Sequence, residues 1–223
     1  MLNRPYDRVK RVLDVIAALV LLLLAAPIWA AVTVALLVAQ GRPVFFRQRR
    51  TGLGGTPFSM LKFRTMLPDH DGTGTASDHL RVTRIGAFLR ATSLDELPNL
   101  VNVLRGEMSM VGPRPMLSMF IEHHAEDHHA LRHSVRPGIT GLAQVNGRNE
   151  LAYVQRFEFD LQYVDRRSLV VDAWIVCRTV PEVLGRRGAS GAEPCALGAT
   201  DAVRSTQYVV PDAAGERVGA SAA

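Results

Sequence analysis

Cysteine is scarce in this sequence, which contains only Cys177 and Cys195 among its 223 residues. Neither a Cys-x-x-Cys pair nor a Cys/His spacing accompanies them, so a disulfide framework and a cysteine-based zinc site are not indicated. This usage fits a reducing, cytosol-facing environment. Glycine-rich nucleotide signatures are also lacking, because the glycines at 52–55 form no Gly-x-Gly-x-x-Gly or Walker pattern. They are predicted to be turn glycines.

A mild surplus of positive charge does not decide between the possible partners of this protein. Lysine and arginine number 26 against 21 acids, giving a net charge of +5. This surplus suits an anionic membrane surface, a phosphate-bearing substrate or nucleic acid equally well. The hydrophobic share of 48% is enough to bury a core, so one compact unit with appendages is expected.

Polar residues are almost missing from 15–39, where Thr33 is the only one. A run of this length is typical of a membrane segment and too long for the apolar region of a cleaved signal peptide. Pro27 divides the run into halves of twelve residues each. Either half, as a helix, would measure about 18 Å, which is too short to cross a hydrocarbon core of about 30 Å.

Two topologies remain open for this run. Proline is tolerated in spanning helices, so a single kinked span is one of them. Basic residues flank both ends of the run, however, and positive charge on both sides favours two cytoplasmic ends. A re-entrant helix that breaks at Pro27 and returns satisfies both observations. The flanking basic residues are Arg4, Arg8, Lys10, Arg11, Arg42, Arg47, Arg49 and Arg50.

A small β-hairpin is predicted after the membrane run. Two β-rich stretches in 43–66 surround the turn at 52–55. Lys62 and Arg64 alternate with apolar neighbours and would share one strand face, either as solvated cations or as paired contacts for a diphosphate. Farther on, the patterns of 79–91 and 168–187 predict amphipathic helices suited to a membrane interface. A core-facing surface helix explains 79–91 equally well.

Adjacent carboxylates and a fixed cation stand out in the stretch 93–115. Asp95 and Glu96 are neighbours, and Arg114 lies between two prolines that restrict its backbone. The dipole of a helix N-terminus, together with nearby arginines, would keep Asp95 ionised, as a carboxylate nucleophile requires. The combination indicates chemistry on an anionic substrate.

A purely structural explanation exists for the same carboxylates. Ser93 and Glu96 fit the Ser-x-x-Glu capping box of a helix start. Pro98 argues that the regular helix begins near Pro98 instead, because proline is best tolerated at the first helical position. In both cases the carboxylates lie at or just before a helix N-terminus.

Four motifs together resemble one family. They are KRVLD before the apolar run, KFRTM at 62–66, LRATSLDELPNLVNVLRGEMSMVGPRP at 89–115 and VRPGITGLAQVNGRN at 135–149. Over roughly residues 8–188 the chain is similar to the bacterial sugar transferases, the monotopic phosphoglycosyl transferases. The resemblance implies a mainly α fold with a small β-hairpin, a proline-broken re-entrant N-terminal helix and interfacial amphipathic helices. The break in the family is often Ser-Pro, whereas Ala26 precedes Pro27 here.

The resemblance also implies an activity. Enzymes of this family move a sugar-1-phosphate from a nucleoside diphosphate sugar, usually a UDP-sugar, to undecaprenyl phosphate, and they release UMP. The product primes surface glycan or glycoconjugate assembly. The family aspartate, matched by Asp95, forms a covalent phosphosugar intermediate, and the family glutamate, matched by Glu96, helps to hold Mg²⁺. The site would face the cytoplasm at the bacterial inner membrane, and no short motif encodes which sugar is carried.

The physical chemistry of the reaction agrees with these implied roles. A diphosphate brings several negative charges towards a carboxylate nucleophile, so cations must offset the repulsion. Mg²⁺ prefers oxygen ligands and retains several waters, so Glu96 with substrate phosphate can suffice. Arg114 can bind phosphate in a bidentate manner. The predicted substrate-binding cations are Lys62, Arg64, Arg90 and Arg114.

A histidine-rich segment near the middle of the chain is the weakest candidate for a site. His124 and His128 are one helical turn apart, but the acids beside them favour an ordinary solvated face over a metal site, and no His-Glu-x-x-His pattern is present. By resemblance, the glycine-rich segment 135–149 borders the substrate pocket, and Arg148 and Asn149 are its candidate contacts. Asp160 and Asp172 match aspartates of the family pattern and are interpreted as structural.

The expected organisation has three parts. These are a membrane element at 1–40, a catalytic domain at 41–188, and a tail at 189–223 that is poor in large apolar residues and therefore mobile in part. The expected partners are a UDP-sugar, undecaprenyl phosphate and membrane lipids, without nucleic acid. A membrane-facing surface of this size is compatible with a homodimer.

A non-catalytic membrane adaptor is the alternative from another functional class. Its basic helices would bind anionic lipid or nucleic acid, which explains the charge and the amphipathic segments. It leaves the grouping of Asp95, Glu96 and Arg114 unexplained, so the sequence favours the enzyme.

Overall fold

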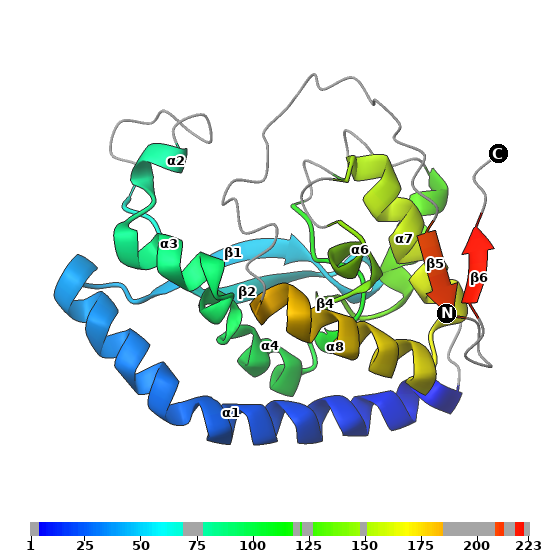
Figure 1. The fold of residues 1–223 in the computed structure, drawn as a ribbon, viewed down its shortest axis with the longest axis horizontal. Coiled ribbons are helices and arrows are strands. Elements are labelled where there is room, and N and C mark those ends of the chain that lie inside the picture. The colour runs from blue at the N-terminus through cyan, green and yellow to red at the C-terminus, as the bar shows by residue number, and fades with distance from the viewer. Residues whose placement is uncertain are drawn as a thin grey trace.

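The computed structural model describes residues 5–68, 78–117, 121, 127–147, 151–184, 208–211 and 217–220. Within these ranges the chain is mainly helical and carries small two-stranded sheets (Figure 1), which confirms the predicted fold class to this extent. Arg148, Asn149 and His124 lie outside the described residues, as does most of the predicted tail.

The apolar run forms α1 (Pro5–Gln40), one continuous helix of 36 residues. The predicted break at Pro27 is therefore a bend, because Pro27 lies inside the helix. Figure 1 shows α1 extending along one side of the molecule and changing direction part-way. Proline removes one backbone hydrogen bond and crowds the preceding turn, which bends a helix without having to end it.

Within the described residues, α1 buries a narrow stripe of side chains against the rest of the protein. Its buried residues are Asp14, Ala18, Val32 and Leu36, two pairs at helical i, i+4 spacing. The helix is long and apolar enough to cross a membrane, with a mean hydropathy of 2.7 in its most apolar window, of which 11% is buried. Exposed apolar surface on this scale suggests association with a membrane.

The predicted hairpin is confirmed. Strands β1 (Phe45–Thr51) and β2 (Pro57–Phe63) pair antiparallel around the short turn η1 (Leu53–Gly55). Phe45 and Phe63 face each other at the open end of the hairpin, and their rings stack at 5.5 Å between centroids. Trp29 of α1 packs on both rings, so an aromatic cluster attaches the hairpin to the N-terminal helix.

The helices after the hairpin form a chain of short elements that leads into the site. They are α2 (Asp78–Arg81), α3 (Arg84–Ala91), η3 (Leu94–Glu96) and α4 (Asn99–Arg105). Gly86 of α3 lies so close to the segment after β2 that a Cβ there would be 1.9 Å from the Thr65 carbonyl oxygen. Only glycine allows this contact, which fixes α3 against the end of β2.

Two short parallel strands lie at the centre of the molecule. β3 (Ser109–Val111) pairs with β4 (Gly138–Thr140), and Figure 1 shows β4 among the surrounding helices. The connecting chain includes η4 (Asp127–Ser134), which packs on α7. β3 leads directly into the Pro113–Pro115 segment, so the strand pair sets the direction in which that segment leaves the core.

The C-terminal helices cover this strand pair. They are α6 (Leu142–Val145), α7 (Tyr153–Arg166) and α8 (Leu169–Leu184). Val171 and Ile175 of α8 are fully buried in the core, while Val176 and Val180 are exposed, so α8 has the predicted amphipathic character. In the predicted tail, β5 (Tyr208–Pro211) pairs antiparallel with β6 (Arg217–Ala220).

Candidate active site

The two carboxylates lie in the short 3₁₀ turn η3. The residue directly before this turn has a strained backbone conformation. Ser93 has a left-handed backbone conformation, with φ of 56°, and its side chain makes no capping hydrogen bond. The predicted capping box is therefore wrong, because Ser93 is outside the extended conformation that an N-cap serine adopts. The regular helix α4 begins at Asn99, directly after Pro98, as the proline argument predicted. Strain of this kind is found at functional sites.

Glu96 is held between two of the predicted cations. Its Oε1 atom lies 2.8 Å from Lys62 Nζ and 3.6 Å from Arg114 Nη2. Lys62 comes from β2 and Arg114 follows β3, so three elements far apart in sequence meet at this carboxylate. All three side chains remain partly exposed, which leaves room for an anionic substrate to share the cations.

Asp95 is 8% exposed, and burial is the main influence on its charge. The pKa of this carboxyl is raised to about 6, and removal from water is the largest cause. Lys62 opposes the rise, the neighbouring Glu96 charge contributes to it, and Arg90 and Arg114 also oppose it. The expectation that nearby charge alone sets its ionisation is thus incomplete, because desolvation outweighs the cations. The carboxyl is still mostly ionised at pH 7, where it can act as a nucleophile.

The four predicted substrate-binding cations separate into two groups. Lys62, Arg90 and Arg114 all act on the charge of Asp95, and Arg90 Nε also donates to Thr65 Oγ1 at 2.9 Å. Arg64 does not join them. Its guanidinium donates to the carbonyl oxygens of Gln40 at 2.5 Å and Gly41 at 2.9 Å, at the C-terminal end of α1.

This position of Arg64 corrects the prediction that it shares a strand face with Lys62. β2 ends at Phe63, so the alternation of side chains along the strand stops before Arg64. A helix leaves its last four carbonyl groups without partners inside the helix, and a buried arginine supplies donors to them. The geometry therefore supports a structural role for Arg64 rather than a substrate contact.

Two buried arginines hold the backbone around Arg114. Arg132 Nη2 donates to the Arg114 carbonyl oxygen at 2.6 Å, and Arg50 Nη1 donates to the Pro115 carbonyl oxygen at 3.2 Å. Arg132 is itself paired with buried Asp160, at 2.5 Å between Nη2 and Oδ2. The Asp160 pairing agrees with the structural interpretation of this residue, and the two arginines hold the backbone from which the Arg114 side chain extends.

A small pocket opens beside Glu96. Asn99, Arg114 and Gly138 contribute to its lining, together with Ile139 of β4, so the glycine-rich segment 135–149 borders this small pocket. Asn99 is 1% exposed, and its side-chain oxygen has no hydrogen-bond partner among the residues that the structure describes. An unpaired buried oxygen next to a carboxylate suits a hard cation, so these residues fit Mg²⁺, with Glu96 and Asn99 as oxygen donors.

Three supporting residues were missed by reasoning from sequence. Asn99 lies within an apolar-patterned segment, and from the sequence Arg50 is one of the charges that flank the membrane run. Arg132 lies in the histidine-rich segment, which the sequence predicts to be a solvated face. The sequence would indicate a buried Arg132 only if its partner Asp160, 28 positions later, were recognised as well. No spacing rule connects these two residues.

Residues 5–186 match the bacterial sugar transferase family. The chain belongs to this family. It is 44% identical over 180 residues to the "Uncharacterized sugar transferase EpsL" of Bacillus subtilis, covering 80% of this chain and 89% of the relative. It is 46% identical over 188 residues to the "UDP-glucose:undecaprenyl-phosphate glucose-1-phosphate transferase" of Caulobacter vibrioides, covering 80% and 70%. It is 41% identical over 198 residues to the "Exopolysaccharide production protein ExoY" of Rhizobium meliloti, covering 80% and 87%.

Family membership confirms the resemblance and the enzyme class drawn from the four motifs. This sugar transferase is a phosphoglycosyl transferase. The alternative hypothesis of a non-catalytic membrane adaptor is therefore rejected. Family membership does not assign roles to individual residues, so these roles rest on the geometry of the site.

Proposed function

We propose that this sugar transferase moves a sugar-1-phosphate from a UDP-sugar to undecaprenyl phosphate, with release of UMP, as the first membrane step of exopolysaccharide or glycoconjugate assembly. The observation that carries the proposal is the grouping of buried Asp95 and adjacent Glu96 with Lys62, Arg90 and Arg114. The relative from Caulobacter is named for UDP-glucose, which makes UDP-glucose the first donor to test.

The first half of the reaction uses Asp95 as the nucleophile. Its carboxylate attacks the sugar-proximal phosphorus, an Asp95–phosphorus bond forms, and the phosphoanhydride bond to UMP breaks. The leaving UMP takes the electron pair of that bond. Arg114 and Lys62 stabilise the charge that collects on the phosphoryl oxygens, and a guanidinium suits this task because it can hold two oxygens at once.

The second half of the reaction returns the enzyme to its starting state. A phosphate oxygen of undecaprenyl phosphate attacks the same phosphorus, and the bond to Asp95 breaks, which regenerates the carboxylate. Mg²⁺, held by Glu96 with Asn99 as a further oxygen donor, would supply charge neutralisation for the diphosphate when bound. Because Lys62 and Arg114 already contact Glu96, they also orient this carboxylate.

The membrane arrangement belongs to the same proposal. We take α1 to be re-entrant, with both ends on the cytoplasmic side of the inner membrane and the active site facing the nucleotide sugar in the cytosol. Both ends of α1 are bonded to one body: Lys10 to Asp172 at the start, and Gln40 to Thr83 at the end. A straight span would separate these ends across the bilayer, so their shared attachment supports re-entry.

An assay of UMP release tests the proposed function. Protein reconstituted in bilayers should release UMP from UDP-glucose continuously only with both Mg²⁺ and undecaprenyl phosphate. Without the lipid phosphate it should release a single equivalent and carry the labelled phosphosugar. Asp95→Asn should lower turnover by about 10³-fold or more and carry no label, because an amide cannot act as the nucleophile.

The matched control is Asp165→Asn, which removes the charge of an exposed aspartate in α7 and should keep wild-type turnover. Retained turnover in Asp95→Asn would remove Asp95 as the nucleophile. A wild-type enzyme that releases no UMP equivalent without lipid phosphate would contradict the covalent step. Activity with another UDP-sugar but not UDP-glucose would change only the donor.

A further inference from the structure

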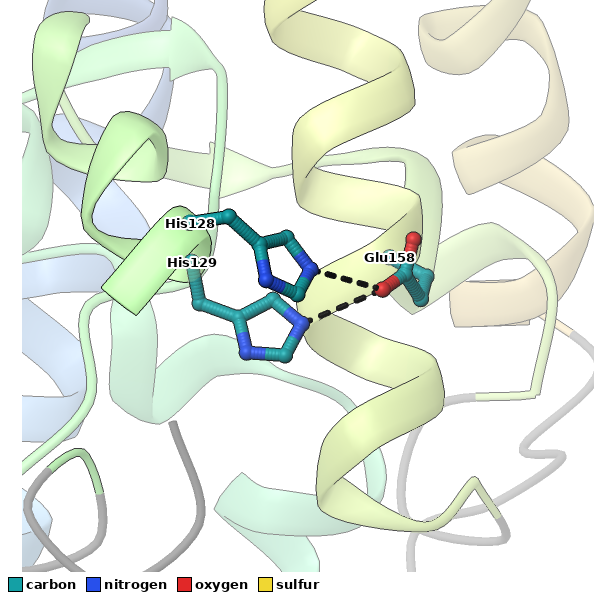
Figure 2. A group of neighbouring side chains, drawn as sticks. All are labelled: His128, His129 and Glu158. Atoms are coloured by element: carbon teal, nitrogen blue, oxygen red, sulfur yellow. Dashed lines mark hydrogen bonds and ion pairs between the residues drawn. The ribbon is translucent and has the colours of Figure 1, made fainter. Parts of the chain in front are cut away.

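Three potential metal ligands converge on one point, away from the catalytic carboxylates. His128 and His129 lie in η4, and Glu158 lies in α7. Figure 2 shows both imidazole rings directed towards the same carboxylate oxygen. Glu158 Oε1 is 3.3 Å from His128 Nε2 and 3.1 Å from His129 Nε2.

These distances match the edges of a metal coordination polyhedron. Zn²⁺ binds imidazole nitrogen and carboxylate oxygen at about 2.0–2.2 Å, so neighbouring ligand atoms of a tetrahedral site are about 3.3 Å apart. All three ligand atoms in this cluster lie within 4.8 Å of one another. An ion could therefore enter between them with small side-chain adjustments. Two histidines and a carboxylate, with water in the fourth position, form an established zinc donor set.

The cluster is set in a rigid joint between two elements. His129 is 1% exposed, and its ring packs on Phe157 at 5.0 Å between centroids. The buried pair of Arg132 and Asp160 joins the same two elements beside it. This packing fixes one imidazole in place, so little side-chain freedom would be lost on binding. The other two ligands are half-exposed, which gives an ion a path from solvent.

An ordinary hydrogen-bonded cluster is the competing explanation. It requires both Nε2 atoms to carry hydrogens and to donate to one oxygen. Metal ligation instead uses the nitrogen lone pairs, with one ion lying between the two Nε2 atoms and the carboxylate oxygen, and the separations of these atoms allow it. The two explanations predict different behaviour towards added metal.

We propose that His128, His129 and Glu158 bind one transition-metal dication, for which Zn²⁺ is the suitable probe, and that this ion fastens η4 to α7. Because Arg132 of η4 also donates to the Arg114 carbonyl, the ion would reinforce the support of Arg114. The site differs in chemistry from the magnesium site proposed at Glu96, since imidazole ligands select borderline metals and Mg²⁺ prefers oxygen.

Metal titration of the full chain tests this inference. The protein is purified without a polyhistidine tag, treated with EDTA, exchanged into detergent buffer and titrated with Zn²⁺ against a coloured chelator. We expect one Zn²⁺ per chain and a rise in Tm of about 2–4 °C at saturation. Excess Mg²⁺ should not displace the ion. Glu158→Gln should weaken Zn²⁺ binding by about tenfold or more and remove the Tm rise, because a neutral amide still accepts a hydrogen bond but is a poor zinc ligand.

Three further variants make the result specific. His128→Ala, at a half-exposed position that tolerates truncation, should weaken binding in the same way as Glu158→Gln. His70→Ala, which also removes one histidine, should bind Zn²⁺ as the wild type does, and so should Glu96→Gln. The inference is overturned if the wild type binds no Zn²⁺, or if Glu158→Gln and His128→Ala both keep wild-type affinity, which would assign the ion to other histidines.

Discussion

At the scale of single residues, Asp95 combines two opposing demands. A nucleophilic carboxylate must be ionised, yet its position away from water makes the ionised form costly. Lys62, Arg90 and Arg114 reduce this cost without cancelling it, since the pKa of Asp95 is raised to about 6. The residue that would carry the chemistry therefore lowers the stability of the fold at neutral pH.

This conflict predicts that Asp95→Asn stabilises the protein in EDTA at pH 7.5. A carboxyl with a raised pKa in the folded state loses its contribution to stability as pH rises from about 4 to about 6, and the loss persists above that range. The neutral amide avoids the penalty, so we expect a gain of about 1–3 kcal/mol in the free energy of unfolding at pH 7.5. Thermal and denaturant unfolding measure it.

The pH dependence separates this effect from a general change in packing. Near pH 4 wild-type Asp95 is protonated in the folded state, so the advantage of Asp95→Asn should disappear. Asp165→Asn, at an exposed position, should change stability little at either pH. A variant that is less stable than wild type at pH 7.5, or equally stabilised at both pH values, would contradict the assigned cause.

At the scale of elements, the close pairing of β3 with β4 sets the position of Arg114. The glycines of two motifs meet here, because a Cβ on Gly138 would lie 2.1 Å from the Gly112 amide nitrogen and 2.3 Å from the Thr140 carbonyl oxygen. The two backbones approach this closely only because neither glycine has a side chain. Gly112 directly precedes the Pro113–Pro115 segment, so the strand pair and the arginine are linked.

Gly138→Ala should therefore impair both stability and catalysis. The added methyl must displace backbone atoms, which we expect to lower the free energy of unfolding by about 1–3 kcal/mol or more. Displacement of β3 would also move Arg114 and reduce kcat. Chemical unfolding and the UMP assay provide the two measurements.

The control for this variant is Gly54→Asn in the hairpin turn. Gly54 has positive φ, which asparagine tolerates, and nothing lies within 4 Å of the Cβ position. Stability and turnover should both stay near wild type. If Gly138→Ala behaves in the same way as Gly54→Asn, the close backbone approach does not determine the position of Arg114.

At the scale of the whole molecule, α1 lies along the catalytic body and is fastened to it at both ends. Arg11 donates to the Val103 carbonyl oxygen at 2.7 Å, and Asp7 accepts from Arg167 at 2.8 Å. At the other end, Arg64 binds the last carbonyl groups of α1. About 54 Å of helix separates the ends along its path, more than a hydrocarbon core of about 30 Å.

This arrangement predicts that both flanks of α1 face the cytoplasm. The test uses a variant in which Cys177 and Cys195 are replaced by serine and a single cysteine is introduced at exposed Arg8 or exposed Arg49. An impermeant maleimide should label neither position in intact spheroplasts and both in inside-out vesicles. Labelling of the Arg8→Cys variant from outside would establish a spanning helix instead. Retained UMP release confirms that each variant is folded.

Local patterns in the sequence determined the type of most elements. The long apolar run predicted the N-terminal helix, the β-rich stretches around four turn residues predicted the hairpin, and Pro98 correctly marked the start of α4. Contiguous motifs were also sufficient to identify the family. These features depend on hydrophobic periodicity and backbone chemistry, which act over a few residues and can be detected in the chain itself.

Only the tertiary structure decided which charged groups meet. In the folded chain Arg64 lies at the C-terminal end of α1, and Glu158 lies beside the two histidines. The predicted capping box is replaced by a turn with a strained residue. The tertiary structure also set the burial of Asp95, on which the pKa depends. The physical reason is that desolvation and ion pairing arise from contacts between segments distant in sequence, so no local spacing encodes them.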